Sequence, residues 1–102
     1  MTVTLSQSST TTAGILLLAI VTIQYGGTFL LRVVSGGVPA TEFQKSFFRA
    51  GHAHAGVLVV LGLVGTILVD ATRLDGFWEA VARDGVPLGA IGMSAGFFLS
   101  AI

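Results

Sequence analysis

The chain has 102 residues, of which 53% are hydrophobic and only 10% are charged, and its five basic residues balance its five acidic ones. A soluble domain carries about 25% charged residues, so this composition argues against a water-exposed surface and indicates an integral membrane protein. Zero net charge gives no basic field for nucleic acid, which argues against that partner. With no cysteine, the chain has no disulfide, thiolate catalysis or Cys-based metal site.

The N-terminal part of the chain changes from a polar segment to a long apolar one. Residues 1–12 are rich in Thr and Ser and carry no charged side chain, which predicts a loose tail. No positively charged region precedes the apolar segment, so residues 13–34 are expected to be a retained membrane helix. Gln24, beside Tyr25 near its middle, should face another helix because an unpartnered amide in hydrocarbon costs free energy. A binding role for Gln24 or Tyr25 is the alternative to helix packing.

Residues 35–49 connect the first apolar segment to the second. Their glycines and proline break the first helix. Thr41 and Gln44 then fit the N-cap and N3 positions of a capping box. We therefore expect a short amphipathic helix at the membrane interface that runs directly into a second span, residues 50–70.

A charged segment, residues 70–86, follows the second span. Its charges are typical of a solvated loop, and Phe77 and Trp78 suit the headgroup level of a membrane. Asp75 is expected to cap a short helix that ends at Asp84-Gly85. The sequence therefore predicts a loop outside the hydrocarbon with one short helix in it.

The third apolar segment covers residues 86–102, with Pro87 at its first helical position. It ends without a polar tail, from which we expect a longer protein with a fourth span. The fold class is thus an all-α integral membrane bundle with three transmembrane helices, in a single domain over residues 1–102. More basic residues flank the first loop than the second, which places the first loop in the cytoplasm and the N-terminus outside.

Small residues recur on one face of each apolar segment, which is typical of helices that pack closely in membranes. On the first segment they are Ala19, Thr22 and Gly26. On the second, the stripe comprises Gly51, Ala55, Leu58, Gly62 and Gly65. On the third they are Gly85, Gly89, Gly92, Gly96 and Ser100. These seams predict tight contacts within the chain or between copies, and hence an oligomer or a larger membrane complex surrounded by lipid.

The chain has two histidines, His52 and His54, in the first turns of the second span. An ionisable residue within a membrane suggests function by default. Side chains at i and i+2 of a helix point about 200° apart, which disfavours one metal ion shared by both rings. Axial ligation of haem by either ring, a structural hydrogen bond and proton handling near pH 6.5 all stay open.

The string RAGHAHAG, followed by an apolar run, resembles a group of small bacterial multi-span membrane proteins of unassigned function, typically with about four helices. That resemblance implies a bacterial plasma membrane. The His-x-His-x-Gly core, which is His52, His54 and Gly56 here, is also similar to a helix of haem–copper oxidase and nitric oxide reductase catalytic subunits. In those families the two histidines ligate two different haems on opposite faces of the helix. The similarity implies that His52 and His54 would each be an axial ligand of a separate haem.

The sequence favours a non-enzymatic role. It shows no nucleophile–base pair, no paired carboxylates within a span and no phosphate-binding loop. The first hypothesis is an accessory subunit of a larger membrane complex, for example a respiratory one, or an oligomeric helical bundle. The second is a haem- or transition-metal-binding redox or sensing protein that uses His52 and His54. The third is a small transporter or channel, with Gln24, Tyr25 and His54 lining its path.

Overall fold

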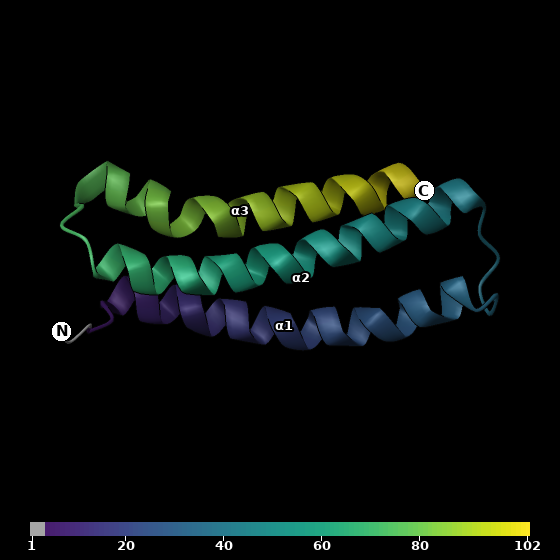
Figure 1. The fold of residues 1–102 in the computed structure, drawn as a ribbon, viewed down its shortest axis with the longest axis horizontal. Coiled ribbons are helices and arrows are strands. Elements are labelled where there is room, and N and C mark those ends of the chain that lie inside the picture. Colours follow the sequence, from purple (N-terminus) through teal and green to yellow (C-terminus); the bar gives the residue numbers. More distant parts are fainter. Residues whose placement is uncertain (1–3) are drawn as a thin grey trace.

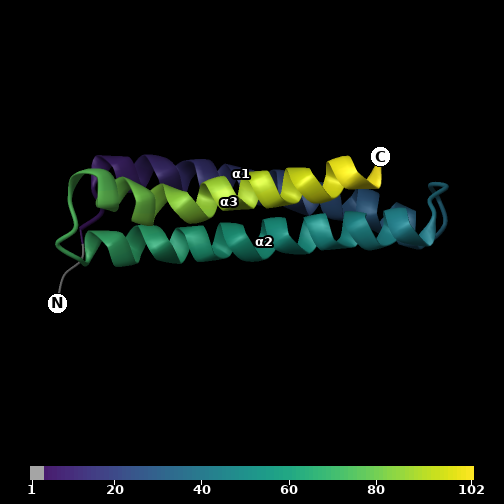
Figure 2. The same ribbon diagram turned by 90° about the horizontal axis from the view of Figure 1, so that it is seen from above.

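The computed structural model describes residues 4–102, which fold into three long helices. These are α1 (Gln7–Val34), α2 (Glu42–Asp70) and α3 (Gly76–Ala101). They run up, down and up along the long axis of a body of 50 × 21 × 18 Å, with α2 between its neighbours in the first view (Figure 1). Seen from above, α1 and α3 lie on the same side of α2 (Figure 2). The expectation of an all-α bundle is confirmed.

Two of the three helices are long and apolar enough to cross a membrane. They are α1 and α2, by length and composition. The third helix is not among them, and its N-terminal part carries Glu79, Arg83 and Asp84. A third span therefore stays a prediction.

The helix α1 begins earlier than the sequence suggests. Ser6 is its N-cap, and the Ser6 hydroxyl accepts a hydrogen bond from the Ser9 backbone N–H at 3.1 Å. The expectation of a loose tail is wrong for residues 7–12, because this cap and the contacts of Ser9 with α2 hold the first turn. Residues 1–3 of the expected tail lie outside the described part of the chain.

The capping box at the start of α2 is confirmed. The Gln44 backbone N–H donates to the Thr41 hydroxyl at 3.1 Å, and the Thr41 backbone N–H donates to the Gln44 side-chain carbonyl at 2.9 Å. From Glu42 the helix continues without interruption to Asp70. The amphipathic start and the second apolar segment are therefore one continuous helix, as the sequence predicts.

The third helix differs from the prediction. Asp75 occupies the N-cap position, but its side chain makes no capping hydrogen bond. The helix does not end at Asp84-Gly85, and Pro87 lies inside it instead of at its first position. Proline removes one backbone donor there, but its ring packs against α2, where a Cβ on Gly62 would lie 3.2 Å from Pro87 Cγ. The helix continues through the proline, whose ring lies beside Gly62 of α2.

The core of the bundle is small and has one buried apolar residue from each helix. Leu16 of α1, Val59 of α2 and Ala90 of α3 form it. Gly62 lies beside this core, and a Cβ there would also lie 3.1 Å from Leu16 Cδ1. A side chain larger than hydrogen would therefore crowd both Leu16 and Pro87.

Candidate functional site

The histidine His52 joins α2 to α1. Its Nε2 lies 3.0 Å from the backbone carbonyl oxygen of Ile23. Because a carbonyl oxygen only accepts hydrogen bonds, Nε2 carries the proton in this arrangement. Gly27 gives the ring room to approach, since a Cβ there would be 3.4 Å from His52 Nε2. His52 therefore acts as a hydrogen-bonded link between two helices.

The second histidine, His54, faces the other neighbour of α2. Its Nδ1 lies 2.7 Å from the backbone carbonyl oxygen of Ala50, one turn earlier in the same helix, so Nδ1 is the protonated nitrogen. Its ring packs against Phe97 of α3, with ring centroids 4.8 Å apart and planes 33° apart. His54 thus lies on the side of α2 that faces α3.

The two rings contact different helices and do not converge on one point. Each uses one ring nitrogen for a backbone carbonyl, which leaves Nδ1 of His52 and Nε2 of His54 as the nitrogens with ligand capacity. Within residues 4–102, no three or more His, Asp or Glu side chains cluster as a metal site would require. Each ring can therefore offer at most one nitrogen to a metal or haem iron, and the two nitrogens lie on separate sides of α2.

The expectation for Gln24 is wrong within this chain. Both Gln24 and Tyr25 are exposed on α1, and Tyr25 keeps 78% of its surface accessible. The face of α1 that meets α2 is carried by residues such as Leu16, Ile23 and Gly27 instead. The structure therefore does not bring Gln24 and Tyr25 together with His54, whose ring lies against α3.

Three glycines of α2, Gly51, Gly62 and Gly65, lie against α3. Gly51 is buried, and a Cβ there would be 3.0 Å from Phe98 Cε2 and 3.2 Å from Phe97 Cβ. Gly62 is buried against Pro87, while a Cβ on Gly65 would lie 4.0 Å from the nearest atom across the interface. Ala55 is half-buried in the same region. These residues allow α2 and α3 to pack at close range.

The glycines of α3 lie on the opposite side of that helix from its contact with α2. Gly89, Gly92 and Gly96 are exposed, and a Cβ on any of them would have no heavy atom within 4 Å. Gly85 and Ser100, on the same stripe, are also exposed. We call these five residues the outer seam; all five are exposed on the surface of the described chain.

A polar cluster that the sequence did not predict joins all three helices at one end of the bundle. Asp70 of α2 accepts hydrogen bonds from the Ser6 backbone N–H at 2.6 Å and the Ser9 hydroxyl at 2.9 Å. Arg83 of α3 donates from Nε to the Ser9 hydroxyl at 3.3 Å and forms an ion pair with Glu79. Arg83 is buried, so the expectation that every charge of this segment is solvated is wrong for it.

The sequence contained one signal for this cluster. Glu79 and Arg83 are spaced i, i+4, which suits an ion pair on a helix. Both residues lie within the short helix expected from Asp75 to Asp84, so their spacing could have predicted the pair. The contribution of Ser6 and Ser9 has no comparable signal, because both belong to a polar segment that resembles a tail.

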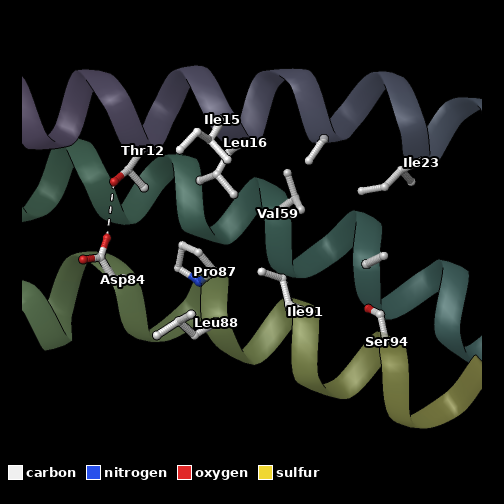
Figure 3. A pocket seen from close by; sticks show the side chains of 13 residues that line it. Thr12, Ile15, Leu16, Ile23, Val59, Asp84, Pro87, Leu88, Ile91 and Ser94 are labelled. Atoms are coloured by element: carbon white, nitrogen blue, oxygen red, sulfur yellow. Dashed lines mark hydrogen bonds between the residues drawn. The ribbon is translucent and has the colours of Figure 1, made fainter. Parts of the chain in front are cut away.

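An apolar groove of about 460 Å³ lies between α1 and α3, with α2 as its floor (Figure 3). Its walls are almost entirely aliphatic and include Ile15, Leu16, Ala19, Ile23, Val59, Leu88 and Ile91. At one end the Thr12 hydroxyl donates to Asp84 at 3.3 Å and bridges α1 to α3. Farther along, the groove is lined by Ser94 of α3 and Ala55 of α2.

The fold and these sites define an all-α bundle of three antiparallel helices, two of them apolar enough to cross a membrane. No protein-family model, curated protein or solved structure matches the chain. The assignment of function therefore depends on the geometry of the helices and their exposed faces.

Proposed function

We propose that this chain is a non-enzymatic integral membrane subunit that associates laterally through α3, with its own copies as the first partner. The observation that carries the proposal is the outer seam. Its small residues lie on the face of α3 that points away from the rest of the bundle. In membranes, rows of small residues allow two helix backbones to approach closely and gain van der Waals contacts.

The rest of the surface supports a lipid environment. Large apolar side chains are exposed on all three helices, for example Leu18 at 72%, Val57 at 60% and Leu99 at 72%. In water such a surface would aggregate, because contiguous apolar patches beyond a few hundred Å² are rare on soluble monomers. Hydrocarbon solvates these side chains, and α3 would then be held in the membrane by its uncharged C-terminal stretch and its packing on α2.

Self-association can be measured by energy transfer between donor- and acceptor-labelled chains in lipid vesicles. Gly92→Leu places a bulky side chain on the outer seam and should weaken association about tenfold or more, because close backbone approach is lost. Gly14→Leu is the matched control, since Gly14 is also exposed with no heavy atom near its Cβ position but lies on α1. Equal association of both variants with the unmodified chain would contradict the proposal.

A second candidate function is haem or metal binding by the histidines. The observation that favours it is that each ring commits only one nitrogen to a backbone carbonyl. One axial nitrogen is enough for a haem iron, so each histidine could supply one ligand on its own side of α2. A visible absorption spectrum of the purified protein, oxidised and reduced, tests this: a haem band that is lost in His52→Ala or His54→Ala supports ligation, and a colourless, metal-free protein opposes it.

A further inference from the structure

The ten charged side chains divide unequally between the two ends of the bundle. At the end where α1 passes into α2 (Figure 1), one acid, Glu42, is accompanied by three basic residues, Arg32, Lys45 and Arg49. The opposite end has two basic side chains and four acidic ones. The end at the first loop is therefore the one that attracts anionic groups.

Arg49 is the basic residue of this end that lies nearest to the apolar part of α2. It is exposed and forms no ion pair within residues 4–102, whereas Lys45 lies 3.3 Å from Glu42. The residues that follow it, 50–69, include no Asp, Glu, Lys or Arg. As a helix they extend about 30 Å, which is the thickness of the hydrocarbon layer of a bilayer. Arg49 therefore lies at the depth of the lipid phosphates.

An open hollow of about 480 Å³ lies on the surface of α2, on the hydrocarbon side of Arg49. We call it the α2 hollow; it is lined by His52, Ala53, Gly56, Val57, Val60 and Leu61. Ala53, Gly56 and Val60 follow Arg49 at i+4, i+7 and i+11, so all four lie on one face of the helix. A Cβ on Gly56 would have no heavy atom within 4 Å, so this glycine leaves the space above it open.

The lining of the α2 hollow suits a hydrocarbon chain. His52 borders it on the side of α1, where its Nε2 donates to the Ile23 carbonyl oxygen at 3.0 Å. The other lining residues are aliphatic or glycine. Side chains of a helix tilt toward its N-terminus, so Arg49 is directed toward the first loop and the headgroup layer. The one charged group beside the hollow is thus at the end nearest to the membrane surface.

We propose that Arg49 and the α2 hollow together bind one anionic phospholipid of the bilayer. Its phosphate pairs with the Arg49 guanidinium, whose N–H donors match the geometry of phosphate oxygens. One acyl chain lies along Ala53, Gly56 and Val60. A phospholipid has its phosphate and its hydrocarbon chain in the same order, along the membrane normal, as the arginine and the hollow.

A phospholipid fits this position better than a helix of another protein would. A carboxylate on such a helix would be costly to place at the edge of the hydrocarbon, whereas lipid phosphates are already present at this depth. The proposal requires the chain to lie in a membrane, as the proposed function does. It is independent of self-association through the outer seam.

The experiment uses the full chain in nanodiscs that contain equal parts of phosphatidylglycerol, which is anionic, and phosphatidylcholine, which is zwitterionic, with matched acyl chains. Native mass spectrometry identifies the lipid that stays bound when the chain is released. We expect one retained lipid per chain, with phosphatidylglycerol preferred about fivefold, the effect of one basic residue at an anionic surface. Arg49→Gln should bring the two lipids close to equal retention. Arg73→Gln is the matched control, because it removes an exposed arginine at the other end of the bundle and should keep the preference.

A second variant tests the location independently of the headgroup. Gly56→Leu fills the α2 hollow from an open Cβ position and should lower the retention of both lipids, with helix content checked by circular dichroism. Gly14→Leu, the same substitution at an exposed glycine of α1, should leave retention unchanged. Equal retention of the two lipids by the unmodified chain would overturn the proposal. A preference that persists in Arg49→Gln would overturn the role of Arg49, and full retention in Gly56→Leu would overturn the hollow as the site.

Discussion

At the scale of single residues, glycines that are close together in the sequence have very different surroundings in space. Gly51 and Gly56 are both within α2, five residues apart. A Cβ on Gly51 would lie 3.0 Å from Phe98 Cε2, whereas a Cβ on Gly56 would meet nothing within 4 Å. The role of each glycine is therefore decided by the helix that faces it, and not by its membership of a glycine-rich segment.

This contrast gives a prediction for stability. Gly51→Ala should lower the free energy of unfolding by about 1–3 kcal/mol, because it overpacks the contact with Phe97 and Phe98. Gly56→Ala should be neutral or stabilising by up to about 1 kcal/mol, because alanine favours the helix and finds open space. Unfolding titrations in mixed detergent, followed by circular dichroism, measure both. A Gly51→Ala variant as stable as Gly56→Ala would show that α2 and α3 are not in close contact there.

The histidines give a prediction that needs no substitution. His52 donates from Nε2 to Ile23 of α1, and His54 donates from Nδ1 to Ala50 of its own helix. In their neutral forms the two rings should therefore be opposite tautomers. Nitrogen-15 NMR of ring-labelled protein distinguishes them, with His52→Gln used to assign the signals. The same tautomer in both rings would contradict the hydrogen bonds described here.

At the scale of elements, the end of the bundle that carries Asp70 is held by polar contacts, and the opposite end by aromatic ones. Near the first loop, Phe29 and Phe48 meet edge to face at 5.4 Å, and Phe47 and Phe97 at 5.8 Å. At the other end, Asp70 connects the last turn of α2 to the first turn of α1. The hydrogen bonds of Asp70 hold the N-terminus of α1, which would otherwise fray.

Replacement of Asp70 should therefore cost stability where replacement of Asp75 does not. Asp70→Ala removes the acceptor of the Ser6 and Ser9 hydrogen bonds and should lower the free energy of unfolding, because these donors then lose a charged partner. Asp75→Ala is the control, because the Asp75 side chain makes no capping bond. Hydrogen exchange at residues 7–12 should also speed up in Asp70→Ala alone. Equal hydrogen exchange in the two variants would show that Asp70 does not hold the first turn of α1.

The sequence predicted those features of the elements that depend on local chemistry. The capping box of Thr41 and Gln44 is recognisable because both of its bonds lie within four residues. The path of α3 through Pro87 was not predictable in this way, since it depends on Gly62 in another helix. The same applies to Ser9, whose partners Asp70 and Arg83 are more than sixty residues away in sequence. At these positions the structure is decided by contacts between residues that are distant in the sequence, which local patterns do not show.

At the scale of the whole molecule, α2 is the centre of the bundle, and the other two helices pack mainly on it. Each histidine of α2 contacts a different neighbouring helix: His52 contacts α1, and His54 contacts α3. Direct contacts between α1 and α3 are few, which leaves the apolar groove between them. The outer seam lies on the far side of α3 from α2. The molecule therefore has two separate faces without partners, one hollowed and one lined with small residues.

We propose that copies of this chain meet in a membrane through the outer seam. Because the chain has no cysteine, a single Gly92→Cys variant reports this contact directly through disulfide formation in lipid vesicles. We expect rapid crosslinking to a dimer on mild oxidation for Gly92→Cys, and little for Gly14→Cys at the same density in the membrane. If Gly92→Cys crosslinked no faster than Gly14→Cys, association through the outer seam would be contradicted.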